Sequence, residues 1–365
     1  MFFRHRLSVS LARLLELPIG LCLVVSMQSN PITLAQKLKD APPPPRLKPK
    51  QEPQPTPQQG DRSDVVSVDT AEVLLPVTVR DAAGQLVTNL ARKDFRVFED
   101  SIEQPLSDLS LRQVPVDVVL MVDASSSVSD NFEDFRRAAA GFAEYLSPDD
   151  RLSLIQFDDR VVLLQDWTKS RVQFSRSLRR VTPGMFTRFN DALVLAAREQ
   201  FARSNARRAI IVLTDGIDSG RGTTFDSALR SSLEALATIY VISNTEIERA
   251  RKQEQLSALI NVSDSVARFN QIRIDDLKLG LDALDMSERN LSALTSATGG
   301  KLFKPRSFDD LDRTYAEVAN ELRHQYALYY SPINKRHDGR FRKVRVETND
   351  RDQRVSARVG YYVPK

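Results

Sequence analysis

Three oxygen-bearing side chains follow one apolar run at alternate positions. Asp123, Ser125 and Ser127 come directly after residues 116–122, whose apolar members are mostly β-branched. In an extended turn, side chains two residues apart point the same way, so the carboxylate and the two hydroxyls can face one point. Oxygen ligands of this kind suit a hard divalent cation. The motif D-x-S-x-S is short enough to occur by chance, so it indicates a metal site only if further ligands lie elsewhere in the chain.

Two later segments offer those partners. Asp215 follows a second apolar run, residues 209–214, and Thr187 lies between the two runs in a loop that opens a helix. If both runs are parallel strands, Asp123 and Asp215 stand at the same edge of the sheet. Ligands of open α/β sheets collect at that edge, outside the carboxyl ends of the strands.

In these residues the chain resembles the von Willebrand factor type A (VWA) family. The metal-ion-dependent adhesion site (MIDAS) of that family combines D-x-S-x-S, a loop threonine followed four residues later by Asp, and an Asp after a third strand. All five ligand positions are matched in order, by Asp123, Ser125, Ser127, Thr187 and Asp215. The resemblance implies that they hold Mg²⁺, or else Mn²⁺ or Ca²⁺. It also implies a coordination position open to an Asp or Glu carboxylate of a partner protein.

The elements that must position these residues form an alternating series. Apolar runs predict strands at residues 116–122, 152–157, 209–214, 237–243 and 301–303, with an antiparallel edge strand at 161–164. Helical patterns fall between them at residues 131–146, 170–181, 191–203, 224–236 and 307–323. This alternation predicts an α/β fold with a doubly wound, mostly parallel sheet, as in VWA and Rossmann-like domains. We assign residues 114–323 to a VWA domain.

Strand patterns flank that domain on both sides. Residues 64–113 form an N-terminal β segment, and residues 324–365 form a C-terminal β segment with runs at 326–331, 341–347 and 355–363. We expect the two segments to pair in a β-sandwich into which the VWA domain is inserted. Pro76 predicts that the first strand lies at an edge, because proline donates no ladder hydrogen bond. Residues 77–100 resemble the β-rich lead-in of VWA-related proteins found especially in acidobacteria.

Residues 246–286 depart from the compact family pattern, because they form a long and charged insertion. The insertion follows a strand's carboxyl end, so we expect it on the same face as Asp123. Two interpretations remain open: a helical insertion that packs against the rim, or a specificity or lid element over the metal. Ser287 is predicted to cap a helix that ends at Gly299, and Ser307 to cap the last helix.

Residues 1–36 are typical of a signal peptide. A basic start precedes a mainly apolar stretch, residues 14–27, and small residues precede Gln36. The apolar stretch is shorter than the ~20 residues that span a bilayer. Residues 37–63 are a Pro-rich linker that cannot bury a core. We therefore expect a bacterial protein exported to the periplasm, the cell envelope or the medium, with anchoring through the N-terminus as the alternative.

Composition argues against most enzymatic sites. The single cysteine, Cys22, lies in the leader, and the histidines, His5, His324 and His337, are far in sequence from the candidate ligands. The sequence therefore gives little support to Ser-His-Asp hydrolysis or to a thiolate metal site. No glycine-rich phosphate loop follows a strand. The net charge of +4 is partly due to the first fifty residues, and no basic stripe marks a nucleic-acid surface.

Three functions remain open on the sequence alone. The first is an exported, divalent-cation-dependent protein-binding module for adhesion or assembly, which is not an enzyme and takes no small-molecule substrate. The second is a structural envelope scaffold with a vestigial metal site. The third is a metal-dependent hydrolase or phosphoryl-accepting enzyme, which usually needs a second carboxylate where Ser125 stands. Asp130 is interpreted as a helix cap, and Asp191 as a helix cap or a support of the ligands.

Overall fold

The computed structural model describes residues 72–110, 114–125, 132–204, 206–220, 222–260 and 270–364. All of them belong to one compact unit, Ser67–Lys365, and the other unit is Met1–Val66. The predicted signal peptide and Pro-rich linker, together with Ser127 and Asp130, lie outside the described residues. Within those residues, no helix has the length and apolar character required to cross a membrane.

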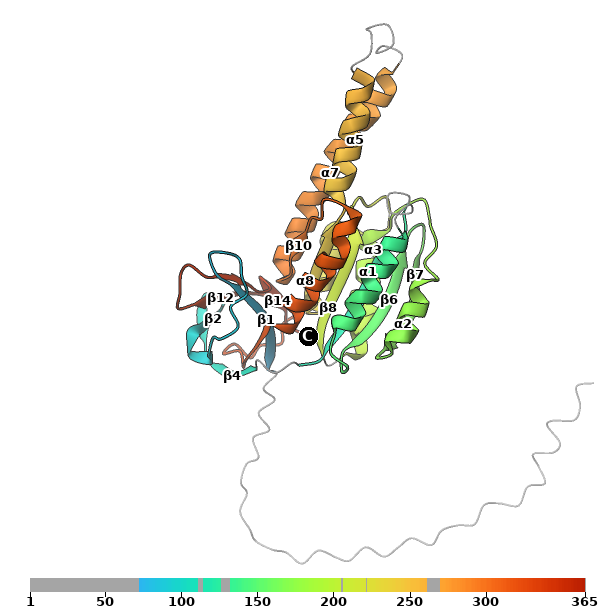
Figure 1. Cartoon of the computed structure of the whole chain (residues 1–365). Helices are drawn as coiled ribbons and strands as arrows, with labels where there is room; N and C mark the ends of the chain where they lie inside the picture. Colours follow the sequence, from blue (N-terminus) through green and yellow to red (C-terminus); the bar gives the residue numbers. More distant parts are fainter. Residues whose placement is uncertain are drawn as a thin grey trace, which may run out of the picture. The chain divides into compact units, whose positions relative to one another are not determined.

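A six-stranded sheet forms the centre of the described unit, in the order β10-β9-β8-β5-β6-β7 (Figure 1). β5 pairs in parallel with both β6 and β8, whereas β7 runs antiparallel to β6 at one edge. Both the wound parallel sheet and the antiparallel edge strand were predicted from the sequence, and both are confirmed. The strands are β5 (Val116–Asp123), β6 (Arg151–Phe157), β7 (Val161–Thr168), β8 (Arg207–Thr214), β9 (Thr238–Ser243) and β10 (Leu302–Phe303).

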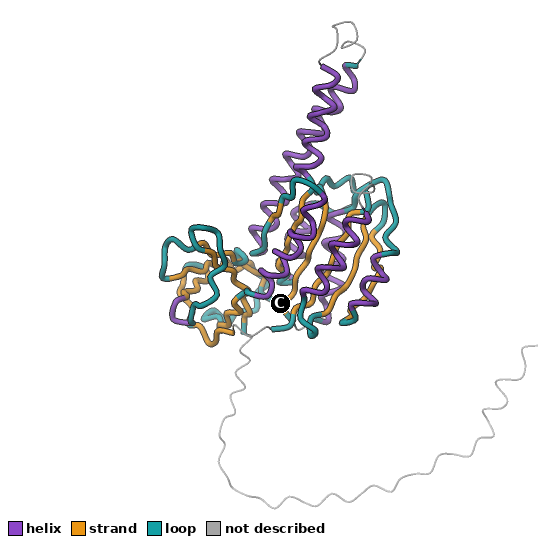
Figure 2. The backbone as a smooth tube through the Cα atoms, in the orientation of Figure 1, coloured by secondary structure: helices purple, strands orange, loops and turns teal. Residues whose placement is uncertain are grey.

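Helices cover both faces of this sheet (Figure 2). β5 is buried along its whole length, and its side chains alternate between two cores. Val118 and Leu120 belong to the core under α1 (Phe132–Tyr145), α2 (Arg171–Leu178) and α8 (Leu311–Arg323). Val119 and Met121 belong to the core under α3 (Phe189–Leu195), α4 (Phe225–Glu234) and α7 (Gln271–Thr298). Two short helical turns, Ala196–Gln200 and Phe201–Arg203, continue α3.

The two flanking segments build a β-sandwich of two four-stranded sheets, in the orders β13-β1-β11-β4 and β14-β12-β2-β3. β1 pairs with β11 and β2 with β12, so strands from both ends of the chain interleave, as predicted. Side chains from both sheets share one apolar core. The strands are β1 (Val73–Arg80), β2 (Phe95–Glu99), β3 (Ile102–Gln104), β4 (Leu106–Ser110), β11 (Tyr326–Tyr330), β12 (Phe341–Thr348), β13 (Arg354–Ser356) and β14 (Gly360–Tyr362).

Two predictions for the sandwich are wrong. β1 is an inner strand, not an edge strand, because β13 lies along its other side. β13 pairs only with residues 78–80, so β1 has no partner on that side at Pro76, and the proline is tolerated there. The run at 355–363, predicted as one strand, divides into β13 and β14, which belong to different sheets.

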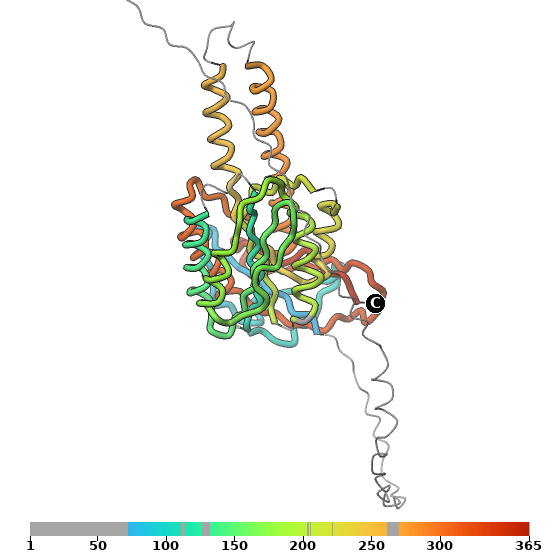
Figure 3. The backbone as a smooth tube through the Cα atoms, turned by 90° about the vertical axis from the view of Figure 1, so that its right-hand side faces the viewer, coloured from blue at the N-terminus to red at the C-terminus, as the bar shows by residue number. Residues whose placement is uncertain are grey.

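The described residues of the 246–286 insertion belong almost entirely to two helices. α5 (Thr245–Ile260) and α7 lie side by side, as Figure 3 shows. Ser287 does not cap a helix, because α7 begins at Gln271 and runs through it. The predicted end is confirmed: Gly299 caps α7 with φ of 78°, a left-handed conformation that glycine adopts without a steric penalty. Ser307 precedes a short 3₁₀ turn, Phe308–Asp310, and its side chain makes no capping hydrogen bond.

Candidate metal centre

Asp123 is the last residue of β5, and its side chain is completely buried. One carboxylate oxygen, Oδ2, accepts a 2.6 Å hydrogen bond from the Thr214 hydroxyl. The other, Oδ1, accepts a 3.0 Å hydrogen bond from the backbone N–H of Ser125. Thr214 is the last residue of the neighbouring parallel strand β8, so the register of the sheet fixes the orientation of the Asp123 carboxylate.

Asp215 comes directly after β8, also at the carboxyl edge of the sheet. Its Oδ1 accepts a 3.0 Å hydrogen bond from the N–H of Ile217, and its backbone carbonyl accepts one from the Ser287 hydroxyl of α7. Gly216 has φ of 70°, and a Cβ there would stand 2.5 Å from the Ser287 hydroxyl oxygen. Glycine is therefore needed both for the turn and for the close approach of α7.

Ser125 and Thr187 lie in two loops that hydrogen bonds hold in place. Ser125 is buried and hydrogen-bonds to Asp123 through its side chain as well as its backbone. The N–H of Thr187 donates to the Ser219 hydroxyl at 2.8 Å, and its carbonyl accepts from the N–H groups of Ser219 and Gly220 at 2.9 and 3.1 Å. These bonds join the Thr187 loop to the loop that follows Asp215.

Asp191 is the third residue of α3, not its cap. Its carboxylate accepts hydrogen bonds from Arg188 Nε at 2.7 Å and from the Thr223 hydroxyl at 2.5 Å. Both contacts hold neighbouring loop segments together. The carboxylate thus has a structural role in these segments, and its interpretation as a support of the ligands stays a prediction.

The two strand-end carboxylates affect each other. Burial and the negative charge of Asp215 raise the pKa of Asp123 to about 7. A cation between such groups would offset both the burial and the repulsion. The described residues contain no group of three or more His, Cys, Asp or Glu side chains that could hold a metal. The candidate donors at this edge are two carboxylates, Asp123 and Asp215, with hydroxyls nearby, a mixed oxygen set of the kind that suits a hard divalent cation.

Residues 118–217 match the family model of the von Willebrand factor type A domain. This chain carries a VWA domain. The matched region begins in β5 and ends just after Asp215, so it contains the D-x-S-x-S turn, the Thr187 loop and the Asp215 turn. VWA domains generally mediate interactions between proteins. A comparison with the sequences of curated proteins gives no match.

Solved structures with similar folds include proximal thread matrix protein 1 from the mussel byssus, at 16% identity and a TM-score of 0.44 over 61% of this chain and 50% of that one. This chain thus spans about half the length of the mussel protein. Another structure of that protein, with a zinc-occupied MIDAS motif, matches at 17% identity and a TM-score of 0.43, over 62% of this chain and 50% of that one. A von Willebrand factor type A protein from Catenulispora acidiphila matches at 10% identity and a TM-score of 0.43, over 79% of this chain and 72% of that one.

Sequence reasoning missed several side chains near the MIDAS positions of this VWA domain. Asn244 follows β9 at the same sheet edge, is completely buried, and both polar atoms of its amide lack a hydrogen-bond partner among the described residues. Glu248 of α5 is also buried. Burial raises the pKa of Glu248, and the charge of Asp215 acts in the same direction. Asn244 could have been found from its place at a strand end, whereas no local signal marks Glu248.

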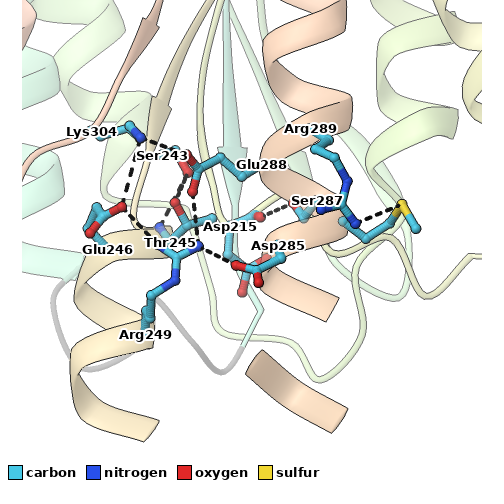
Figure 4. A network of polar contacts seen from close by, with 11 residues as sticks. Asp215, Ser243, Thr245, Glu246, Arg249, Asp285, Ser287, Glu288, Arg289 and Lys304 are labelled. Atoms are coloured by element: carbon cyan, nitrogen blue, oxygen red, sulfur yellow. Dashed lines mark hydrogen bonds and ion pairs between the residues drawn. The ribbon is translucent and has the colours of Figure 1, made fainter. Parts of the chain in front are cut away.

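Ion pairs fix the root of the α5–α7 hairpin beside the VWA sheet edge (Figure 4). Arg249 of α5 contacts Asp285 and Glu288 of α7 at 2.8 and 3.0 Å, and Glu246 at 2.7 Å. Lys304, just after β10, contacts Glu288 at 2.6 Å. Single exposed ion pairs contribute little to stability, but a shared network holds several side chains in one geometry. The network thus joins α5 and α7 at the hairpin root and ties both to the segment that follows β10.

Proposed function

We propose that this chain is an exported, divalent-cation-dependent protein-binding module. In this proposal Asp123, Ser125, Ser127, Thr187 and Asp215 hold Mg²⁺, or Mn²⁺ or Ca²⁺, and a partner protein supplies an Asp or Glu carboxylate. The observation that carries the proposal is the pair of neighbouring, buried carboxylates at the carboxyl edge of a VWA sheet. A buried charge without compensation is costly, so this pair is best explained by a bound cation.

The donor types favour capture of an outside carboxylate. Hydroxyl ligands are neutral, so two carboxylates leave less negative charge around the cation than three or four would. When bound, the cation supplies a coordination position at which an additional carboxylate gains strong electrostatic attraction. The Thr214 hydroxyl and the Ser125 N–H hold Asp123 in one orientation, which favours a preformed site.

Exposed apolar side chains before Thr187 and along the α5–α7 hairpin support a protein partner. Met185 and Phe186 precede Thr187 and are 75% and 58% exposed. On the hairpin, Ile272 and Leu279 are 77% and 66% exposed. Exposed large apolar side chains next to a binding site, such as Met185 and Phe186, are typical of protein-interaction surfaces. We therefore favour the interpretation of residues 246–286 as an element that contributes to partner specificity.

Metal titration tests the proposal directly. Calorimetry with Mg²⁺, and with Mn²⁺ and Ca²⁺, should show binding to the wild-type chain and none to Asp123→Asn. The control is Asp352→Asn, because Asp352 lies in an exposed turn far along the chain from the candidate ligands. Equal binding by wild type and Asp123→Asn would refute the metal centre. Absence of binding in all three proteins would favour the scaffold with a vestigial site.

A second experiment addresses the partner. The immobilised wild-type chain is exposed to cell-envelope extract in Mg²⁺ and then washed with EDTA. We expect a protein fraction that EDTA releases from wild type and from Asp352→Asn, but that Asp123→Asn does not retain. A fraction retained equally by all three proteins would show that binding does not use the metal.

A further inference from the structure

A cavity of about 360 Å³ opens between the β-sandwich and the amino-terminal end of the central sheet. Arg208, near the start of β8, and Leu236, just before β9, line one side of it. Leu74 of β1 and Tyr362 of β14 line the other. The cavity thus lies at the opposite end of β8 from Asp215, and its volume falls in the range of small-molecule sites, about 300–1,000 Å³.

Arg358 contributes a buried positive charge to this cavity. The residue is 4% exposed, and its Nε has no hydrogen-bond partner among the described residues. The titratable groups that act on it are Tyr330 and the like-charged Arg208, and neither is a carboxylate. Burial, together with Arg208, lowers the pKa of Arg358 to about 10, so the guanidinium stays charged at neutral pH.

The other deeply buried arginines of the described residues are compensated. Arg342, 2% exposed, forms an ion pair with Glu99 at 3.3 Å. Arg207, 7% exposed, donates two hydrogen bonds to the carbonyl of Leu322 at 3.1 Å. A buried charge normally has a partner, because desolvation without one is costly. Arg358 is the exception among these three, which indicates that its partner comes from outside the chain.

The remaining charges around the cavity are mostly basic. Lys335, Arg336 and His337 line it from the loop between β11 and β12. Its two acidic residues have other partners: Glu234 pairs with Arg230 at 2.8 Å, and Glu72 accepts a 2.5 Å hydrogen bond from the Ser107 hydroxyl. The cavity therefore favours an anion, and its aliphatic and aromatic walls favour one with an apolar body.

One wall residue is held in an uncommon backbone conformation. Leu236 has φ of 57°, in the left-handed region that residues with a side chain rarely adopt. Such residues gather at functional sites, where the surrounding structure holds them in place. In this chain the turn between α4 and β9 places Leu236 in the cavity wall.

We propose that this cavity is a second binding site, which takes an organic anion whose carboxylate pairs with Arg358 and whose apolar body lies against Leu74, Leu236 and Tyr362. The guanidinium fork matches a carboxylate in a bidentate arrangement. The site is independent of the candidate metal centre, so it binds its ligand in the presence of EDTA.

The test uses the full chain in EDTA with three probes: octanoate, 1-octanol and inorganic phosphate. Octanoate should raise the thermal unfolding midpoint and give a calorimetric binding signal. Octanol lacks the charge and phosphate lacks the apolar body, so each should bind at least about tenfold more weakly, the loss that corresponds to one charge-assisted pair or two buried methylenes. Equal affinity for octanoate and octanol would overturn the role of Arg358, and equal affinity for octanoate and phosphate would overturn the apolar wall.

Two test variants and one control variant sharpen the test. Arg358→Met should abolish octanoate binding without lowering the midpoint of the unliganded protein, because no internal ion pair is lost. The matched control, Arg354→Met, changes an exposed arginine of β13 that does not line the cavity and should bind as wild type does. Lys335→Glu, on an exposed loop position, keeps the test decisive if Arg358→Met does not fold, and should weaken octanoate severalfold. Wild-type affinity in Arg358→Met or in Lys335→Glu would overturn the proposal.

Discussion

The hydroxyl of Ser287 donates a hydrogen bond to the backbone carbonyl of Asp215. The first residue lies in the middle of α7, and the second follows β8. This bond joins the hairpin to the turn that carries a candidate metal ligand. A displacement of α7 would therefore move the Asp215 backbone, so a contact made on the hairpin would be mechanically linked to the proposed metal position.

Replacing Ser287 by Ala should weaken Mg²⁺ binding severalfold, because the Asp215 turn loses a buried hydrogen bond worth about 1 kcal/mol. Calorimetry of the two proteins measures the difference. Ser292→Ala, an exposed position on the same helix, is the control and should bind like wild type. Identical Mg²⁺ affinities for wild type and Ser287→Ala would show that α7 does not position Asp215.

Replacing Arg80 by Met should destabilise the fold by about 3 kcal/mol, because it leaves Glu321 of α8 buried without its ion-pair partner. Adding Glu321→Gln should restore much of that loss, since the uncompensated charge is then removed. Chemical denaturation measures both free energies of unfolding. Arg96→Met breaks an exposed pair with Glu103 and should destabilise the fold far less than Arg80→Met does. A double variant no more stable than Arg80→Met would contradict this account.

The ion pairs at the root of the α5–α7 hairpin should contribute less stability in acid. The hydrogen bond from Lys304, with Arg249, lowers the pKa of Glu288 below its usual value of 4.5. A carboxylate with a lowered pKa contributes stability above its unfolded pKa and loses it as the pH falls through the folded value. Wild type should therefore be more stable than Glu288→Gln above about pH 4.5, and the difference should disappear at lower pH. Thermal unfolding between pH 3 and about 6 measures it.

The control for this pH series is Glu254→Gln, because Glu254 lies exposed on α5. Its stability should follow that of wild type at every pH. If the difference in stability between wild type and Glu288→Gln stays constant through the acid range, titration of Glu288 is not the source of that difference.

Replacing Ile272 and Leu279 together by Glu should reduce capture of the EDTA-released protein fraction. Both side chains are largely exposed, so the free energy of unfolding should change by no more than about 0.5 kcal/mol each. Val172→Glu, at a 62% exposed position on α2, is the matched control. Pull-downs in Mg²⁺ compare the three proteins. If the hairpin variant captures as much protein as wild type does, the other interpretation holds, in which residues 246–286 are an insertion that only packs against the rim.

The strands of the central sheet could be predicted from sequence because burial on both faces gives a continuous apolar run. Residues 116–122 and 209–214 appear as β5 and β8, with Asp123 and Asp215 at the same edge. The supporting contacts could not be predicted. The hydroxyl of Thr214 reaches Asp123 only through the pairing of two strands that are far apart in sequence.

Ser287 and Pro76 show why local signals failed elsewhere. A serine before an apolar run resembles a helix cap, but Ser287 is used for a tertiary contact inside a long helix. Pro76 lies in an inner strand because its neighbour β13 is too short to reach it. The part that Ser127 plays in the metal centre, and the roles of the five ligands together, stay predictions that metal titration tests.

The two sandwich strands that flank the VWA domain in sequence are neighbours in one sheet. β4 precedes the domain and β11 follows it, and the two pair antiparallel, with Ser110 opposite Ala327. Tension applied between the flanking segments would therefore load the interstrand bonds of the sandwich and bypass the central sheet, which carries Asp123 and Asp215. The spacing of Asp123 and Asp215 would then stay unchanged while such a force acts on the sandwich.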